Sequence, residues 1–283
     1  MTAIILDGKK LAQQIQHQLA QTLDNQTQQG MNAPRLDVIL VGDDPASKIY
    51  VAHKQKACQQ VGVTTRLHQL PASTTNQQLT ELITTLNHNT DVDGILLQLP
   101  LPAALNKAEH LEHILPHKDV DGFHPYNQGR LLQANPALRP CTPFGIIQLL
   151  DHYKIDCKGK HAVIIGTSNI VGRPMAMELL LKKATTTLCH QNTVNIERHI
   201  QSADIIISAT GAEHVIDEDW IRAGAVVIDV GIRRDTSGTI RGDIDFERAY
   251  KRAGYITPVP GGVGPMTVAT LLQNTVKARL LAR

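Results

Sequence analysis

The second half of the sequence repeats short apolar runs separated by polar or helical segments, and this repetition constrains the fold more than any other feature. The runs are 161–166 (HAVIIG), 185–189 (TTTLC), 203–209 (ADIIISA) and 225–231 (AVVIDVG). Strands that alternate with crossover segments in this way are typical of a parallel sheet covered by helices. The pattern therefore predicts an α/β domain with a Rossmann-like parallel sheet.

The first half of the chain alternates in the same manner. It has β-like runs at 36–42, 64–69 and 93–100, and helical patterns at 8–29, from Ser47 to Val61, and at 76–88. The segment 136–145 (PALRPCTPFG) contains three prolines and a glycine, which interrupt one pattern before the next begins. A last helical stretch, 265–282, follows a glycine-rich turn and is predicted to be amphipathic. The sequence thus predicts two α/β domains.

The segment 166–174 (GTSNIVGRP) joins a predicted strand to a predicted helix. The dinucleotide fingerprint G-x-G-x-x-G is absent, because its glycine positions read Gly166, Ser168 and Val171. The next glycine is Gly172. A helix that begins after a parallel strand still offers free N–H groups and a positive dipole end to a pyrophosphate. The alternative for this segment alone is a tight strand-to-helix connection that binds nothing.

Composition excludes several classes of protein. The 283 residues carry a net charge of +2 and only 3% aromatic residues, so we expect no nucleic-acid partner. No apolar run is long enough to cross a membrane, and Asp7 and Gly8 interrupt the apolar N-terminus, so neither a membrane span nor a signal peptide is expected. The four cysteines form no C-x-x-C pair, which is typical of reduced thiols in a cytoplasmic protein.

Five polar side chains in the first half could carry chemistry. Tyr50 and Lys54 lie four residues apart on a predicted helix, which puts a phenol and an ammonium on one face. Gln98 ends an apolar strand, where a buried amide needs partners for both of its ends. Asp119 and Asp121 lie around a turn. Taken singly, the first pair also fits a solvated helix face and the aspartates also fit turn chemistry.

Three histidines have a spacing that could indicate a metal site. His110, His113 and His117 lie at positions i, i+3 and i+7. Because Glu109 and Glu112 are interleaved with them, a solvated helix is the better interpretation. We therefore predict no metal site.

Over almost its whole length the chain resembles the bifunctional methylenetetrahydrofolate dehydrogenase/cyclohydrolase family. The matching blocks occur in the family's order and are PASKIYVAHKQKAC (45–58), GILLQLPLP (94–102), KDVDGFHP (118–125), RPCTPFG (139–145), GTSNIVGRPMA (166–176), VVIDVGI (226–232), GDIDF (242–246) and TPVPGGVGPMTVATL (257–271). A single block would be weak, whereas an ordered set of this length is specific.

The resemblance implies a role for each matching position in the first domain. Lys54 falls on the catalytic lysine, which as amine and ammonium can act as base and acid when a methenyl bridge is hydrolysed. Gln98 supports that lysine, Tyr50 packs on the flat substrate, and Asp121 anchors the pterin through its N–H donors. Substrate-binding positions implied in this way are Ser47, Tyr50, Asp121, Cys141, Pro260, Gly261 and Gly262.

The resemblance also implies the domain organisation. Residues 1–140 and the C-terminal helix 265–283 would form the folate-binding catalytic domain, and residues 141–264 a Rossmann-like NADP-binding domain. A folate-binding cleft would lie between these two domains. The family further implies a cytoplasmic homodimer that acts on tetrahydrofolate one-carbon substrates.

The cofactor positions implied by the resemblance lie in the second domain. They are Gly166, Thr167, Ser168, Ile170, Val171, Gly172, His190, Gln191, Thr210, Gly211 and Ile232. NAD enzymes of this type usually place an acid at the end of the second strand, and the stretch TTTLCHQNT at 185–193 has none. His190, Gln191 and Thr193 can hydrogen-bond a 2′-phosphate, so NADP is favoured over NAD.

Two other classes of function remain as alternatives. A different dinucleotide oxidoreductase, such as an amino-acid or hydroxy-acid dehydrogenase, would fit the second half but would leave Tyr50, Lys54, Gln98 and Asp121 without a purpose. A noncatalytic folate-binding protein would not need Lys54 with its partners.

Overall fold

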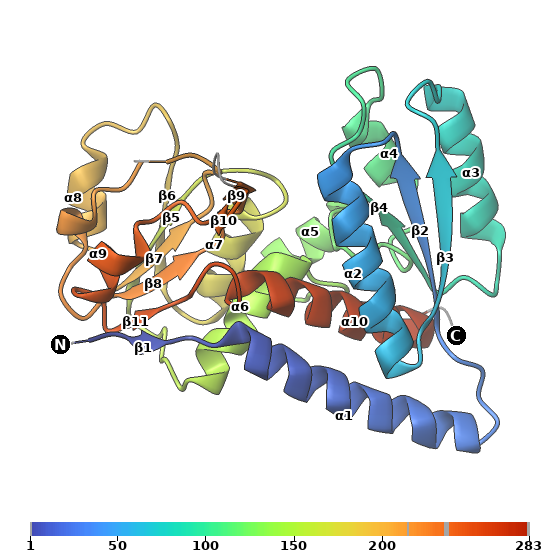
Figure 1. Ribbon diagram of the computed structural model, residues 1–283, viewed down its shortest axis with the longest axis horizontal. Helices are drawn as coiled ribbons and strands as arrows, with labels where there is room; N and C mark the ends of the chain where they lie inside the picture. The colour runs from blue at the N-terminus through green and yellow to red at the C-terminus, as the bar shows by residue number, and fades with distance from the viewer. Residues whose placement is uncertain (1, 214, 235–237, 282–283) are drawn as a thin grey trace. The chain divides into compact units, whose positions relative to one another are not determined.

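The computed structural model describes residues 2–213, 215–234 and 238–281. The chain separates into two compact units (Figure 1). Unit 1 comprises Met1–Ala12 and Thr142–Thr267, and unit 2 comprises Gln13–Cys141 and Val268–Arg283. Each unit has its own parallel sheet and its own buried core. The prediction of two α/β domains is therefore confirmed.

The sheet of unit 1 is parallel, with strand order β1-β11-β8-β7-β5-β6. Its strands are β1 (Ile4–Ile5), β5 (His161–Ile165), β6 (Thr185–Cys189), β7 (Ile205–Ser208), β8 (Val226–Asp229) and β11 (Tyr255–Ile256). The first strand of the Rossmann-like portion, β5, pairs with β6 on one side and with β7 on the other. Strand order reverses there, and open α/β sheets bind ligands at the carboxyl edge of such a switch point.

Short helices and an antiparallel pair of strands complete the described part of unit 1. They are most of α6 (Cys141–His152), then α7 (Gly172–Leu181), α8 (Ile196–Gln201), the 3-10 helix η1 (Glu218–Trp220), α9 (Phe246–Tyr250), and the pair of β9 (Arg233–Arg234) and β10 (Ile240–Arg241). Strands β7 and β8 are buried throughout, as expected for parallel strands covered on both faces. All four strands predicted for this half are present.

The sheet of unit 2 has the order β3-β2-β4 and is also parallel. Its strands are β2 (Arg35–Val41), β3 (Thr64–Leu70) and β4 (Gly94–Leu97). Its helices are α2 (Pro45–Val61), α3 (Asn76–His88), α4 (Lys107–His113), α5 (Pro125–Leu132), and the larger parts of α1 (Gly8–Gln28) and α10 (Val263–Leu281). The three strands and the three helices predicted for this half agree with the observed ones to within a few residues.

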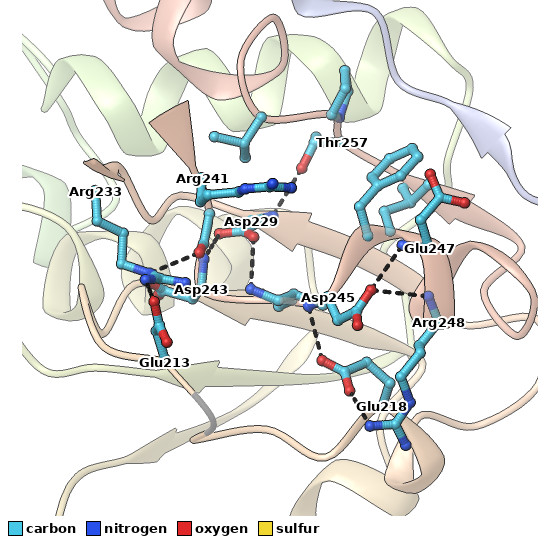
Figure 2. Close-up of a pocket in the computed structure, with 16 residues that line it drawn as sticks. Glu213, Glu218, Asp229, Arg233, Arg241, Asp243, Asp245, Glu247, Arg248 and Thr257 are labelled. Atoms are coloured by element: carbon cyan, nitrogen blue, oxygen red, sulfur yellow. Dashed lines mark hydrogen bonds and ion pairs between the residues drawn. The ribbon is translucent and has the colours of Figure 1, made fainter. Parts of the chain in front are cut away.

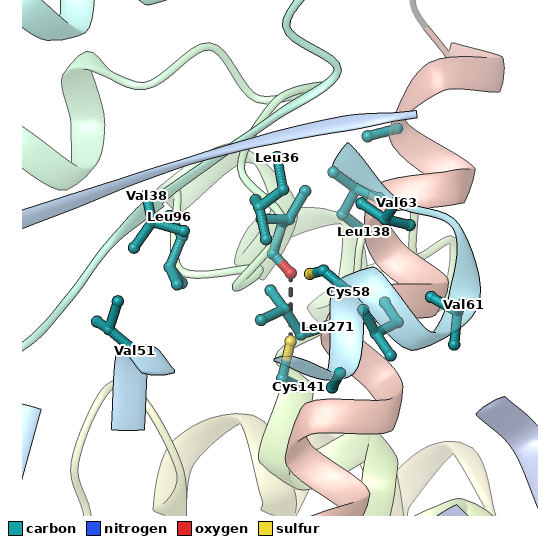
Figure 3. Packing of buried hydrophobic residues seen from close by; sticks show 14 of the residues in the cluster. Leu36, Val38, Val51, Cys58, Val61, Val63, Leu96, Leu138, Cys141 and Leu271 are labelled. Carbon is teal, nitrogen blue, oxygen red and sulfur yellow. Dashed lines mark hydrogen bonds between the residues drawn. The ribbon is translucent and has the colours of Figure 1, made fainter. Parts of the chain in front are cut away.

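Alternate side chains of β2 enter two different hydrophobic clusters. Leu36 and Val38 pack with residues of α2 and α10, as Figure 3 shows. Ile39 packs instead with residues of α3, including Leu79 and Ile83. Each fully buried aliphatic side chain of this size contributes about 1.5–3 kcal/mol. The helices therefore cover both faces of the sheet, and only its strand ends remain for a site.

The first twelve residues differ from the expected domain assignment. They were expected in the folate-binding domain, whereas their contacts place them in unit 1. The reason is β1, in which Ile4 lies opposite Tyr255 and Ile5 opposite Ile256. A two-residue strand has no sequence pattern of its own. Residues 1, 282 and 283 of the expected domain lie outside the described residues.

Helix α10 is not amphipathic in the predicted sense. Its polar residues Thr270, Asn274 and Thr275 are buried together with Leu271 and Leu272. Polar side chains are tolerated inside when they are hydrogen-bonded, as Thr275 is to the Leu271 carbonyl at 2.9 Å. Along the described ranges, no helix combines the length and the apolar character required to cross a membrane.

Candidate active site and cofactor pocket

Helix α2 carries two of the expected catalytic side chains. Asp44 caps the helix by accepting the Ser47 N–H at 2.7 Å, and Pro45 occupies the first turn. Because α2 follows β2, its first turns lie at the carboxyl edge of the sheet. Tyr50 is 38% exposed there, and Lys54 lies half-buried one turn later.

Gln98, directly after β4, contacts Lys54. The Lys54 Nζ donates to the Gln98 Oε1 at 3.0 Å, and the Gln98 Nε2 donates to the Leu99 carbonyl at 2.6 Å. Both ends of the Gln98 amide therefore have a hydrogen-bond partner. This pairing orients the amide so that its oxygen faces Lys54. The structure thus brings together two residues that are 44 positions apart in the sequence.

Asp119 and Asp121 have different surroundings. Asp119 is buried and accepts the N–H groups of Phe123 and His124 at 3.1 and 2.8 Å, and the Asn127 Nδ2 at 2.8 Å. It therefore holds the turn. For Asp121, desolvation raises the carboxyl pKa to about 6, although the positive charge of Lys54 opposes the increase. Of the two aspartates, Asp121 is thus the one whose carboxyl interacts with the charge of Lys54.

Ser47 and Cys141 are both buried, so neither presents its side chain on an open surface. The Cys141 Sγ donates to the Val120 carbonyl at 3.2 Å, and its backbone N–H donates to the Asp121 carbonyl at 3.2 Å. Burial, together with the charge of Asp121, raises the pKa of the Cys141 thiol well above its usual value. Cys141 therefore supports the Asp121 segment and is a poor nucleophile.

Lys118 is a residue that sequence reasoning missed. It is 4% exposed, and its Nζ donates to the carbonyls of Leu86, Asn87 and Asn89 at 3.0, 2.8 and 2.7 Å. Burial lowers its pKa. The ammonium satisfies carbonyls at and just beyond the end of α3 and anchors the segment that leads to Asp121. No local signal could reveal this contact, because its partners lie about thirty residues earlier.

Unit 1 contains a cavity of about 680 Å³ at the carboxyl ends of β5, β6 and β7. Its expected lining residues are Gly166, Thr167, Ser168, His190, Gln191 and Thr210. Thr193, expected to bind the 2′-phosphate, also lines it. The sequence assignment did not include the further lining residues Ile165, Asn192, Ile196, Ala209, Ala212 and Val215. Most of these lie within three residues of an assigned position, so a wider window around the strand ends would have found them. The cavity occupies the switch point predicted by strand order.

Two glycines shape the turn beside this cavity. Gly166 has a φ of +115°, and a Cβ there would overlap the Ala209 carbonyl. A Cβ on Gly172 would overlap the carbonyl of Gly166. These are the tight-turn and close-packing roles that glycines have in dinucleotide-binding folds. The start of α7 has no side-chain cap, which suits a helix end that faces an anion.

The loop after β6 is organised by His190. Its backbone N–H donates to the Thr193 Oγ1 at 2.9 Å, and its Nδ1 accepts the Asn192 N–H at 3.1 Å. In a neutral imidazole the proton is then on Nε2. The ring therefore offers one N–H donor in the exposed loop that borders the cavity.

Several assigned cofactor positions do not line the cavity. Ile170 and Val171 lead into α7, and Gly172 is its first residue. Gly211 follows the lining residue Thr210, and Ile232 lies beyond β8 with 46% exposure. For these five residues a cofactor role stays a prediction.

The expected substrate positions Pro260, Gly261 and Gly262 belong to unit 1. They form a tight turn, in which the Gly262 N–H donates to the Pro258 carbonyl at 2.8 Å. The Gly261 carbonyl accepts the Lys9 N–H at 2.8 Å, and Gly261 has a φ of +111°. Glycine is required at that position because an L-residue rarely adopts this conformation.

His110 does not lie on a solvated helix face, as the sequence predicts for the three histidines. His110 is fully buried in α4 and hydrogen-bonds the Asn76 Oδ1 at 2.8 Å. Burial lowers its pKa. Within the part of the chain that the structure describes, no group of three or more His, Cys, Asp or Glu residues could hold a metal ion.

Comparison with known proteins identifies the family. Residues 6–121 match the model described as tetrahydrofolate dehydrogenase/cyclohydrolase, catalytic domain, and residues 140–282 match the NAD(P)-binding domain of the same family. The match of residues 6–121 shows that the alternative of an unrelated dinucleotide oxidoreductase is wrong.

Individual relatives agree. The bifunctional protein FolD of Legionella pneumophila (strain Corby) is 54% identical over 98% of this chain and 97% of its own length. The crystal structure of the bifunctional enzyme FolD from Campylobacter jejuni has a TM-score of 0.96 and 48% identity, covering 99% of both chains. The methylenetetrahydrofolate dehydrogenase-cyclohydrolase of Trypanosoma brucei, solved with NADP cofactor and an inhibitor, has a TM-score of 0.94 and 36% identity over 99% and 98%. Because these matches extend over both units, the chain belongs to the tetrahydrofolate dehydrogenase/cyclohydrolase family.

Proposed function

We propose that this protein oxidises methylenetetrahydrofolate to methenyltetrahydrofolate with NADP and hydrolyses the product to 10-formyltetrahydrofolate. The observation that carries the proposal is the 3.0 Å contact between Lys54 and Gln98 near the carboxyl of Asp121. A proton-transfer group, its orienting partner and an acceptor-only anchor are what hydrolysis of a bound, cationic pterin derivative needs.

Lys54 is the proposed acid and base. A water loses one proton as it adds to the methenyl carbon. When the bond between that carbon and the ring nitrogen breaks, the nitrogen gains a proton and the new hydroxyl loses its own to become the formyl C=O, so the cationic substrate gives a neutral product and one proton overall. One side chain can perform both transfers because it exists as amine and as ammonium. Gln98 accepts an N–H from either form, so it can keep Lys54 oriented through the reaction.

Asp121 is the proposed anchor for the pterin. An ionised carboxylate only accepts hydrogen bonds, so it can take two neighbouring N–H donors from the pterin edge. With a pKa of about 6 the carboxyl is mostly ionised at neutral pH. Tyr50 supplies an exposed ring for the flat substrate, and the buried Ser47 and Cys141 are assigned to the same site.

NADP is assigned to the cavity of unit 1, and when bound it supplies the acceptor for a hydride. The turn from Thr167 through Ile170 and Val171 leads to the uncapped start of α7, which suits the pyrophosphate. Gly166 and Gly172 allow the close approach of strand and helix that this turn needs. Thr210, Gly211 and Ile232 are assigned to the nicotinamide half, since they follow β7 and β8.

The preference for NADP over NAD is assigned to the loop after β6. His190 offers Nε2–H and Gln191 an amide to a 2′-phosphate, and both line the cavity. No acidic residue follows β6 to bind the ribose hydroxyls of NAD. Neutral donors contribute less than a bidentate arginine, so the preference should be modest.

The remaining assignments are part of the same proposal. Unit 2 (13–141 and 268–283) is assigned to folate binding and catalysis, and unit 1 (1–12 and 142–267) to NADP. Pro260, Gly261 and Gly262 are assigned to the substrate. A homodimer is supported by β3, an edge strand with mostly exposed side chains. A cytoplasmic location agrees with four free cysteines.

The test is to measure turnover of methylenetetrahydrofolate with NADP and with NAD, and hydrolysis of the methenyl compound without nucleotide. We expect both activities, with NADP preferred. Tight folate binding without either turnover would support the noncatalytic alternative instead.

A further inference from the structure

Two buried aspartates at the carboxyl edge of the unit 1 sheet have no role in the proposal above. Asp229 ends β8, and Asp243 follows β10 in the GDIDF block. They are 4% and 5% exposed. Both line a second cavity of about 530 Å³, in which Figure 2 shows them next to each other.

Asp229 hydrogen-bonds the backbone of the segment that contains Asp243. Its Oδ1 accepts the N–H groups of Gly231 at 2.9 Å and Asp243 at 3.0 Å, and its Oδ2 accepts that of Ile244 at 2.9 Å. Its own N–H donates to the Thr257 Oγ1 at 2.8 Å (Figure 2). The backbone on both sides of Asp243 is therefore tied to the end of β8.

Asp243 in turn fastens the loop after β7. Its Oδ2 lies within hydrogen-bond distance of the Ser208 Oγ at 3.0 Å, the Thr210 N–H and Oγ1 at 2.8 and 2.9 Å, and the Gly211 N–H at 3.3 Å. Hydrogen bonds to a charged acceptor are stronger than neutral ones. One carboxylate oxygen thus accepts from Ser208, the last residue of β7, and from Thr210 and Gly211 in the loop that follows.

That loop separates Asp243 from the cofactor cavity. Ala209, Thr210 and Ala212 line the 680 Å³ cavity, whereas Asp243 lines the 530 Å³ cavity and is absent from the first lining. The carboxylate therefore acts on the far side of a wall that the cofactor is proposed to touch. It has no direct contact with the space assigned to NADP.

Two glycines leave the space that the carboxyl groups of Asp229 and Asp243 occupy. A Cβ on Gly231 would overlap the carboxyl group of Asp243, and a Cβ on Gly242 would overlap the carboxyl group of Asp229. These glycines belong to the VVIDVGI and GDIDF blocks. Both blocks therefore serve one packed arrangement of two carboxylates.

We propose that Asp243 is a positioning residue for the dehydrogenase reaction, holding the Ser208–Gly211 loop in the shape that the nicotinamide half of NADP requires, with Asp229 as its support. This inference rests on the proposed NADP site. Misplacing a binding wall by about 1 Å can cost up to about a hundredfold in rate. The effect of Asp243 should therefore be confined to cofactor-dependent turnover.

The experiment uses Asp243→Asn and Ser208→Ala, with both activities measured on each protein. Asp243→Asn keeps the shape but weakens the acceptor, and should raise the KM for NADP or lower the dehydrogenase kcat by about 10- to 100-fold. Ser208→Ala removes one of the donors to Asp243. Because Ser208 does not line the cofactor cavity, the effect should be smaller but in the same direction. Hydrolysis of the methenyl compound without nucleotide, and the KM for folate, should not change.

Asp245→Asn is the matched control. Asp245 lies two residues further on and caps α9 by accepting the N–H groups of Glu247 and Arg248, so it does not reach the loop. If Asp243→Asn and Ser208→Ala both lose thermal stability and lose the two activities to the same extent, Asp243 has only a structural role. That result would overturn the inference. Unchanged NADP kinetics in both variants would also overturn it. A wild-type protein without NADP-dependent turnover would instead overturn the proposed function on which the inference rests.

Discussion

The candidate sites of the two units are constructed in opposite ways. In unit 2 the proposed chemistry depends on single side chains, namely Lys54, which hydrogen-bonds Gln98, and Asp121, whose pKa is raised to about 6. In unit 1 the cavity is formed by a glycine turn, strand ends and neutral donors. A site made of side chains can lose its function through one substitution. A site made largely of backbone should lose affinity gradually, unless a substitution displaces the backbone itself.

The largest expected effect is that of Lys54→Met. Loss of a general acid and base typically reduces a rate by about 10²- to 10⁴-fold, so hydrolysis of the methenyl compound should fall by roughly that factor. Binding of NADP, measured by fluorescence titration, should not change because Lys54 belongs to the other unit. Lys56→Met, on the exposed side of the same helix, is the control. Hydrolysis within a few-fold of wild type would remove Lys54 from the mechanism.

Asp121→Asn should reduce both activities together, because it anchors a substrate common to both. Hydrogen bonds to a charged group contribute about 1.5–3 kcal/mol, which corresponds to a rise of about 10- to 150-fold in the folate KM. A fall in one activity only would contradict the anchoring role.

The pH dependence sharpens this prediction. In wild type the dehydrogenase kcat/KM for folate should fall as the pH drops below about 6, where Asp121 becomes protonated, and Asp121→Asn should lack that step.

The stability of the protein should also depend on Asp121. Its folded-state pKa is raised above the usual value of 3.8, so the native state binds the proton more tightly than the unfolded state. The free energy of unfolding contributed by Asp121 therefore decreases as the pH rises from about 4 to 6. Chemical denaturation should show Asp121→Asn to be more stable than wild type at pH 8, by up to about 3 kcal/mol.

Gly172→Ala tests the candidate cofactor site of unit 1, which is formed largely by backbone groups. Because the added Cβ would overlap the Gly166 carbonyl, strand and helix must separate. Such overpacking costs about 1–3 kcal/mol, and we expect a rise of about tenfold or more in the KM for NADP, with methenyl hydrolysis retained. Gly129→Ala is the control, since a Cβ there meets no atom within 4 Å. An unaltered KM in Gly172→Ala would show that the turn is not the pyrophosphate site.

Gln191→Arg should have the smallest effect. The wild-type preference for NADP over NAD should be on the order of 1–3 kcal/mol, since it depends on neutral donors. An arginine should increase the ratio of kcat/KM values for NADP and NAD by about tenfold. Gln201→Arg, exposed at the end of α8, controls for the added charge. If wild type prefers NAD, or if Gln191→Arg leaves the ratio unchanged, the loop after β6 does not bind the 2′-phosphate.

Much of the candidate cofactor pocket was predictable because its residues follow strands that the sequence reveals. Gly166, His190 and Thr210 each lie within two residues of a strand end, and parallel strands bring those ends to one edge. Lys118 and Asp243 were not predictable in this way. Lys118 binds carbonyls near the end of α3, and Asp243 binds a loop 33 residues earlier, so neither bond has a local pattern.

The sequence by itself determined the α/β class, the parallel sheets and the places where strands give way to helices. Apolar runs and glycine turns act locally, over the length of one strand or one helix start, and so can be read from neighbouring residues. Only the tertiary structure decided that Lys118 reaches the carbonyls near the end of α3, that residues 4 and 5 pair with β11, and that His110 is buried. These contacts depend on the order and register of strands, which place distant segments together only after the sheets have formed. Sequence spacing alone does not contain that information.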